Sequence, residues 1–136
     1  MSMFSIFNIS GSALHANSVR LNVTASNLAN AESASSSTSQ TYRARSPVFA
    51  TLMEEGFDHS SAGVEVTGII ESQAPLRREY QPGHPLADQE GYINLPNVNP
   101  VEEMANMIAA SRAYQSNLEV INTSKTLLTR TLSLGQ

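Results

Sequence analysis

The sequence predicts a mainly α-helical fold, in which long N-terminal and C-terminal helices pair as a coiled coil. An irregular central segment with short β-strands or hairpins joins them. Apolar residues recur every seven positions at both ends of the chain, and prolines and glycines gather between the two ends. We therefore expect residues 1–31 and 99–136 to form one paired-helix domain, and residues 32–98 to form a linker and a small β-rich or irregular segment.

The first helix is expected from about Phe4 to Ala31, a stretch without proline whose only charged residue is Arg20. Its other face carries serine, asparagine and threonine, which are mediocre helix formers because their side chains compete for backbone hydrogen bonds. Such a helix is marginal alone and needs a partner. Its apolar stripe consists of Phe7, Leu14, Leu21 and Leu28, broadened by Ala13, Val23 and Ala25.

The second helix has clear start and stop signals. Asn99 is expected as the N-cap, Pro100 occupies the first helical position, and Glu102 supplies an acid in the first turn. No proline or glycine follows until Gly135, which is a natural stop. The helix should therefore span about 34 residues, or roughly 50 Å at the usual rise per residue.

Two series of residues spaced by seven run along this second helix. Sustained spacing of this kind favours a left-handed coiled-coil seam, and the first helix, with its own seven-residue ladder, is the expected partner. The first series is Met107, Tyr114, Ile121 and Leu128, and the second is Met104, Ser111, Leu118, Lys125 and Leu132. The second series is apolar at three of its five positions.

The central segment opens with a serine-rich run, Ser33 to Gln40, which is expected to be a linker that buries no apolar surface. Strand-like runs follow at Val48 to Met53 and at Gly63 to Ile70, and the second loses its alternation at Gly68, which indicates a bulge or bend. The remainder should form turns and short extended pieces such as Tyr92 to Leu95.

Composition excludes several classes of function. The net charge is −4, only 15% of residues are charged, and the basic residues are scattered, so no nucleic-acid surface is expected. The chain has no cysteine and no apolar run near the ~18 residues of a membrane span. Its start lacks the basic and apolar regions of a cleaved signal peptide, so any export from the cytoplasm should leave the chain uncleaved.

No catalytic or metal-binding pattern is present, and we expect neither an enzyme nor a cofactor. The three histidines, His15, His59 and His84, lie far apart in the sequence and lack the spacing of zinc ligands. Neither the Gly-x-Ser-x-Gly nucleophile elbow nor a phosphate-binding glycine loop occurs in the sequence. An active site built from His59 or His84 with nearby carboxylates is the remaining enzymatic alternative. The acids around Gly56 fit a solvated loop better; they are Glu54, Glu55 and Asp58.

The two helices could form only an intramolecular hairpin, or they could make a soluble coiled-coil adaptor that dimerises through the seam from Met104 to Leu132. The lack of charge argues for a dense assembly of many chains, because neighbours bury serine, asparagine and alanine more cheaply than charge. Small residues on several sides permit close helix approach. They are Ala13, Ala16, Ala25 and Ala29 in the first helix and Ala105, Ala109, Ala110 and Ala113 in the second.

Motifs along nearly the whole chain resemble bacterial flagellar rod and hook proteins, and in detail the FlgC type of proximal rod protein. The N-terminal signature runs from Gly11 to Leu14 and from Arg20 to Ala31. Further matching pieces are Tyr42-Arg43-Ala44, Ile70 to Pro75, Pro82 to Asp88, Gly91 to Ile93, Leu95 to Val98, Ala110 to Gln115 and Thr131 to Gln136.

The resemblance implies export by the flagellar type III apparatus and assembly into the basal-body rod in the periplasm, as a helical tube that transmits torque. It implies further copies, rod proteins of the FlgB and FlgF types, the adaptor FliE and the export apparatus as partners. The assembly interface should lie on the terminal helices. The expected residues are Leu14, Leu21, Val23, Asn27, Leu28, Asn30, Met104, Met107, Tyr114, Leu118, Ile121, Leu128 and Leu132.

Overall fold

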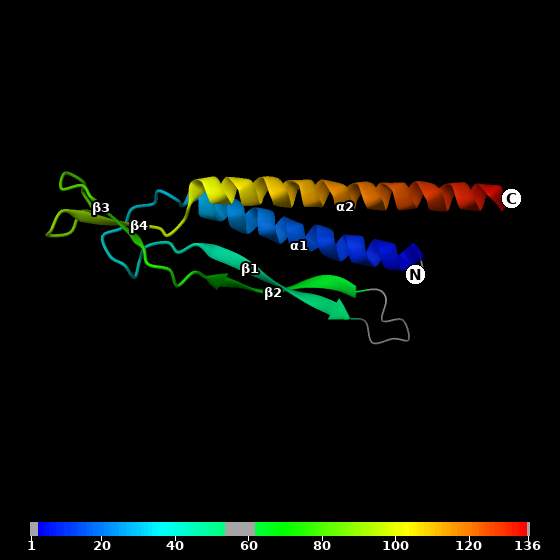
Figure 1. Ribbon diagram of the computed structural model, residues 1–136, viewed down its shortest axis with the longest axis horizontal. Helices are drawn as coiled ribbons and strands as arrows, with labels where there is room; N and C mark the ends of the chain where they lie inside the picture. The colour runs from blue at the N-terminus through cyan, green and yellow to red at the C-terminus, as the bar shows by residue number, and fades with distance from the viewer. Residues whose placement is uncertain (1–2, 54–61, 136) are drawn as a thin grey trace.

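The computed structural model describes residues 3–53 and 62–135 of the chain, so the acidic turn at Glu54, Glu55 and Asp58 and the neighbouring His59 lie outside the described residues. Two long antiparallel helices lie side by side, and a β-hairpin covers the first helix on its other flank (Figure 1). A second hairpin projects at the end opposite the chain termini (Figure 1). The elements are α1 (Met3–Ala29), β1 (Arg45–Met53), β2 (Ala62–Glu71), β3 (Arg77–Tyr80), β4 (Tyr92–Leu95) and α2 (Pro100–Leu134).

Helix α1 confirms the predicted N-terminal helix, although it ends at Ala29, shortly before the predicted end at Ala31. Its polar side chains bond back to the carbonyl groups of their own preceding turn, as Asn17 does to Ala13 and Thr24 to Arg20, both at 2.8 Å. These local bonds satisfy the polar groups without charge.

Helix α2 is 35 residues long and begins as the sequence predicts. The side-chain oxygen of Asn99 accepts a hydrogen bond from the backbone N–H of Val101 at 3.2 Å, which confirms Asn99 as the N-cap. Two acids, Glu102 and Glu103, occupy the first turn at the positive end of the helix dipole. The helix ends at Leu134, directly before Gly135.

Strands β1 and β2 form an antiparallel hairpin with a break in register. Val48 lies opposite Gly68 and Phe49 lies opposite Val66, so Thr67 is the extra residue of a bulge. The predicted irregularity at Gly68 is therefore confirmed. Strand β1 begins at Arg45, three residues before the predicted start, because Pro47 can still pair within a strand at the sheet edge.

Strands β3 and β4 form the second hairpin, and the sequence predicted only its second strand as an extended piece. The serine-rich run is more than a linker, which corrects the prediction. Ser35 exchanges two backbone hydrogen bonds with Asn94 of β4, at 2.9 and 3.1 Å. Backbone groups must find partners wherever water is excluded, and β4 is buried from Ile93 to Leu95, so it takes partners on both edges.

The buried apolar residues fall into two groups. Ala16 and Val23 of α1 and Ala110 of α2 lie in the helical part, while Ala31, Ile93, Leu95 and Val98 are buried in the central segment. Over residues 3–53 and 62–135, neither helix combines the length and apolarity that crossing a membrane requires.

Candidate assembly interface

The face of α2 that is turned from solvent consists of two series spaced by seven. One series is the predicted set of Met107, Tyr114, Ile121 and Leu128, all of them half-buried. The other is Glu103, Ala110, Asn117 and Ser124, in which Ala110 and Ser124 are buried. Since α1 is the only described element that packs against α2, these two series form most of its contact with α1, and Asn106 beside them contacts Arg20.

The second predicted seam series does not face α1. Met104, Leu118 and Leu132 are 54%, 43% and 71% exposed, and Lys125 is exposed as well, with Ser111 half-buried. The physical reason is size: a small side chain at Ala110, with no exposed surface, and another at Ser124 let the two helix backbones approach. The buried series of α2 therefore lies one residue before the predicted one.

The apolar members of this series, Met104, Leu118 and Leu132, are exposed on one flank of α2. We define the outer strip as the exposed residues Val101, Met104, Ile108, Leu118 and Leu132. A second set spaced by seven, Val120, Leu127 and Leu134, is exposed on the other flank of the helix. By helical position, the charged residues of α2 are mostly on the face between these two flanks, opposite α1; they are Glu102, Arg112, Glu119 and Arg130.

Helix α1 uses its apolar residues within the chain. Its predicted interface residues Leu14, Leu21 and Leu28 are half-buried, and Val23 is buried. On the side of the β1–β2 hairpin, the hydroxyl of Ser12 accepts a hydrogen bond from the backbone N–H of Val64 at 3.1 Å. A Cβ atom at Gly63 would lie only 3.0 Å from this hydroxyl, so the close approach of β2 to α1 favours glycine there.

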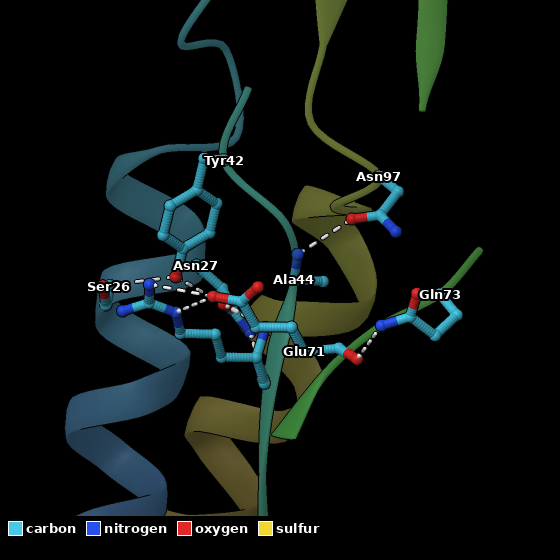
Figure 2. A network of polar contacts seen from close by, with 8 residues as sticks. Ser26, Asn27, Tyr42, Ala44, Glu71, Gln73 and Asn97 are labelled. Atoms are coloured by element: carbon cyan, nitrogen blue, oxygen red, sulfur yellow. Dashed lines mark hydrogen bonds and ion pairs between the residues drawn. The ribbon is translucent and has the colours of Figure 1, made fainter. Parts of the chain in front are cut away.

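Asn27 is the most enclosed polar side chain of α1, at 1% exposure, and it makes four hydrogen bonds. Figure 2 shows it beside Tyr42. Its side-chain oxygen accepts from the Tyr42 hydroxyl at 2.8 Å and from the Arg45 backbone N–H at 2.9 Å. Its amide nitrogen donates to the Arg45 carbonyl at 2.8 Å and to the Glu103 carboxylate at 3.1 Å. One side chain thus joins α1, the start of β1 and the first turn of α2.

The sequence predicted Asn27 as a residue of the assembly interface. In the structure its side-chain oxygen and nitrogen both make their hydrogen bonds within the chain. Asn30, also predicted at the interface, donates to the Ser26 carbonyl within its own turn. The partners Tyr42 and Glu103 were not singled out as site residues. Glu103 could have been found, because an acid at a seam position is unusual among apolar and small residues.

A second asparagine organises the base of the two hairpins. Asn97 accepts a hydrogen bond from the backbone N–H of Ala44 at 2.8 Å (Figure 2). Its amide donates to the Ala74 carbonyl at 3.0 Å. The Arg43 guanidinium donates to the Ser72 carbonyl at 3.1 Å. These bonds hold together the segments that enter β1, leave β2 and precede α2.

The β3–β4 hairpin carries its own polar cluster around Asp88. One carboxylate oxygen accepts from the backbone N–H groups of Tyr92 and Glu90, both at 2.9 Å, and the other pairs with Arg78 at 2.9 Å. The Tyr92 hydrogen bond, with smaller contributions from Glu90 and Arg78, lowers the pKa of Asp88. The Arg78 guanidinium also lies 4.8 Å from the centre of the Tyr92 ring. Contacts among its own residues therefore stabilise the projecting hairpin.

Nothing in the described part of the chain resembles a metal or catalytic centre. Within residues 3–53 and 62–135, no three histidine or acidic side chains gather as metal ligands would. His15 is exposed on α1, and the ring nitrogen Nδ1 of His84 accepts from the backbone N–H of Leu86. The polar contacts of these residues are those of loops and helix surfaces.

The chain matches two family models, described as "Flagella basal body rod protein" over residues 7–32 and "Flagellar basal body rod FlgEFG protein C-terminal" over residues 89–134. It is 52% identical to the flagellar basal-body rod protein FlgC of Salmonella typhimurium and to that of Yersinia enterocolitica, each over 136 residues. The FlgC of Buchnera aphidicola subsp. Acyrthosiphon pisum is 41% identical over 138 residues. In every case the match covers 100% of both chains.

Full-length identity at this level, together with family models on both helices, identifies a structural protein of the flagellar basal body rather than an enzyme. The chain belongs to the FlgC family of flagellar basal-body rod proteins, and it is a structural subunit of the rod.

Proposed function

We propose that this subunit builds the proximal rod by packing its terminal helices against neighbouring subunits, in a helical tube that transmits torque across the periplasm. The outer strip of α2 is the observation that carries the proposal. Its five apolar residues lie on one flank of a helix against which, among the described elements, only α1 packs. Val101, Met104 and Ile108 lie within two turns of one another, whereas the exposed Lys125 separates Leu118 from Leu132. Exposed apolar side chains gathered on one flank of a helix mark sites of protein association.

Burial of the outer strip against a neighbour would favour assembly. Complete burial of a large apolar side chain is worth about 1.5–3 kcal/mol, and Val101, Met104, Ile108, Leu118 and Leu132 are all exposed. The second set, on the other flank, gives α2 another apolar surface. Two different surfaces on one helix support head-to-tail contacts between neighbours, which grow into an open helical tube when the rotation does not close.

The low charge of the helix pair also supports dense packing. The one charged residue of α1, Arg20, donates to the side-chain oxygen of Asn106 in α2 at 3.4 Å, so its charge is oriented within the chain. Apart from Phe4, the exposed positions of α1 carry small or polar residues, including Asn8, Gly11, Asn22, Ala25 and Ala29. Neighbouring subunits can cover such positions without burying a charge.

We also propose that residues 1–31 and 99–136 act as one domain and residues 32–98 as another, with α1 and α2 supercoiled as a coiled coil along their seam. The repeat of seven on the buried face of α2 supports the supercoil. Two family models that cover residues 7–32 and 89–134 support the division, since they leave most of the central segment unmatched.

Membership of the FlgC family supports further copies, the export apparatus, rod proteins of the FlgB and FlgF types and the adaptor FliE as partners. The proposed route is uncleaved export through the flagellar type III apparatus. A chain without cysteine, whose helices are rich in serine and asparagine, is well suited to travel unfolded and to order fully when it docks. Of the predicted interface residues, Met104, Leu118 and Leu132 are then the direct contacts.

The test places charge on the outer strip of the full-length chain with Met104→Asp and Leu118→Asp together. Both side chains are exposed, so we expect the purified variant to keep the helix content of the parent chain. In cells that lack the native subunit, it should be missing from isolated basal bodies and should not restore swimming. Ser116→Asp, an exposed position on the charged face of α2, is the matched control and should assemble normally.

Normal incorporation of the double variant into basal bodies would contradict the proposal. The sequence also allowed a soluble coiled-coil adaptor, and hydrodynamics distinguishes it. The adaptor would be a stable dimer of the purified chain that the double variant dissociates, whereas the rod subunit should be monomeric at low concentration.

A further inference from the structure

The apolar ladders of α1 and α2 define their relative register poorly. Both repeat every seven residues, so sliding one helix along the other by seven places apolar side chains against apolar side chains again. Hydrophobic contact is not directional, and cores tolerate exchange between apolar residues of similar size. The ladders are Phe7, Leu14, Leu21 and Leu28 in α1, and Met107, Tyr114, Ile121 and Leu128 in α2.

Asn27 interrupts this repetition. It is 1% exposed, and its amide donates across the helix pair to the Glu103 carboxylate at 3.1 Å. A slide by seven residues in one direction brings Ala110, which has no side-chain acceptor, to the place of Glu103. A slide in the other direction carries Asn27 past Pro100, the first residue of α2.

Asn27 also connects α1 to the β1–β2 hairpin. The remaining three hydrogen bonds of Asn27 go to Tyr42 and to the backbone of Arg45, at the start of β1. A buried amide that loses its partners pays the desolvation cost without compensation. Single buried asparagines set helix register in coiled coils for the same reason.

We infer that Asn27 is a positioning residue that sets the register of α1 against α2 and, through Tyr42 and Arg45, fixes the β1–β2 hairpin to that register. The outer strip and the hairpin are thereby presented to neighbours in one fixed relation. This role lies within a single chain and does not depend on the proposed tube.

The chain has no cysteine, so introduced cysteine pairs can report the register directly. Arg20 and Asn106 are in side-chain contact across the helices, and Arg20→Cys with Asn106→Cys reports the native register. Arg20→Cys with Ala113→Cys reports a slide by seven residues. The Arg20 contact is made by the end of a long side chain, so each cysteine pair is joined by a short bifunctional maleimide and not by a direct disulfide. Cross-link yield is measured for both pairs in the full-length purified chain, and the ratio of native to shifted product is compared between variants.

With Asn27 present, the native pair should dominate, and Asn27→Leu should lower the ratio about tenfold, as expected for the loss of one buried polar contact. Asn17→Leu is the matched control, because Asn17 lies in the same helix but bonds only to the Ala13 carbonyl of its own turn. It should leave the ratio unchanged. Glu103→Gln keeps a side-chain acceptor for Asn27 and should also leave it unchanged.

Glu103→Leu removes the contact between the helices while Asn27 keeps its bonds to Tyr42 and Arg45, so it decides the question if Asn27→Leu fails to fold. It should lower the ratio, whereas Glu103→Gln should not. Equal ratios in Glu103→Leu and Glu103→Gln, or an unchanged ratio in Asn27→Leu, would overturn the inference. A parent chain that does not favour the native pair would overturn it as well.

Discussion

Helices α1 and α2 carry similar seven-residue ladders but occupy different surroundings. Helix α1 packs against α2 on one side and against β1 and β2 on another, whereas α2 packs against α1 alone among the described elements (Figure 1). The apolar side chains of α1 are therefore mostly half-buried within the chain. Those of α2 are divided between the seam and the exposed outer strip.

The difference shows that a repeat of apolar residues does not say what covers it. On α1, the ladder is part of the fold of one subunit. On α2, the described part of the chain leaves Met104 and Leu118 exposed, and a rod subunit has neighbours that can cover them. Substitutions on the two kinds of surface should therefore separate folding from assembly.

The largest effect should come from charge in the seam. Leu21→Asp and Ile121→Asp each place a carboxylate at a half-buried position between the helices, at a cost of about 2–4 kcal/mol. That is a large share of the stability of a small chain. We expect loss of helix content by circular dichroism, absence from isolated basal bodies and loss of swimming, with the subunit still detectable in the cells.

Leu21→Met and Ile121→Met keep apolar side chains of similar size and should retain both folding and swimming. Swimming at the parent rate in both aspartate variants would show that the seam is dispensable, and the contrast between the two helices would then lose its basis.

A smaller and more selective effect should distinguish two methionines that lie one turn apart on α2. Met107 is half-buried in the seam, and Met104 is 54% exposed on the outer strip. Met107→Ala should lower the free energy of unfolding by about 1–2 kcal/mol, below the range for fully buried methionine. Met104→Ala should change it by less than about 0.5 kcal/mol.

Urea denaturation of the purified chain measures the first difference, and the amount of subunit in isolated basal bodies measures the second. Met104→Ala should reduce incorporation without loss of stability. If Met104→Ala destabilised the isolated chain as much as Met107→Ala, the outer strip would belong to the fold of the subunit and not to its contacts.

The sequence was sufficient for the elements whose determinants are local. The two helices, the Asn99 cap and the irregularity at Gly68 follow from capping, periodicity and turn chemistry, which act within a few residues. One seam series of α2 was also correct. The other series was predicted one residue too late. Alanine and serine give no hydrophobic signal in a sequence, although the small size of Ala110 and Ser124 is what lets the helices come into contact.

The contacts of Asn27 lay beyond sequence reasoning for a different reason. Its four hydrogen bonds join it to residues 15, 18 and 76 positions away in the sequence, and no local sequence pattern predicts partners at such distances. Strand β3 was missed similarly, since all four of its residues are exposed and the pairing with β4 defines it. Ser35 of the serine-rich run forms a backbone β-bridge with Asn94, a contact that the sequence does not predict either.

A modest and local effect is expected from pH at the β3–β4 hairpin. The Tyr92 N–H, the Glu90 N–H and Arg78 lower the pKa of Asp88 in the folded chain. A carboxylate with a lowered pKa contributes stability above its unfolded pKa and loses it as the pH falls through the folded value. The hairpin should thus loosen below about pH 4. The protection of the Glu90 and Tyr92 amides, taken relative to their intrinsic exchange rates at each pH, measures this. Asp88→Asn should abolish the pH dependence of that protection while the helices remain unaffected.

The smallest effect should come from the ion pair at the base of the β1–β2 hairpin. The Arg45 guanidinium donates twice to one oxygen of Glu71, at 3.0 and 3.2 Å, but both side chains are about half exposed. Exposed pairs of this kind contribute about 0–1 kcal/mol and are screened by salt. Glu71→Gln should therefore lower the unfolding free energy only at low ionic strength, and the difference should vanish in concentrated NaCl. Asn27 holds the backbone of Arg45 in either case. A loss comparable to that of Met107→Ala, at any salt concentration, would mean that the hairpin is held by this surface pair rather than by Asn27 and the helix behind it.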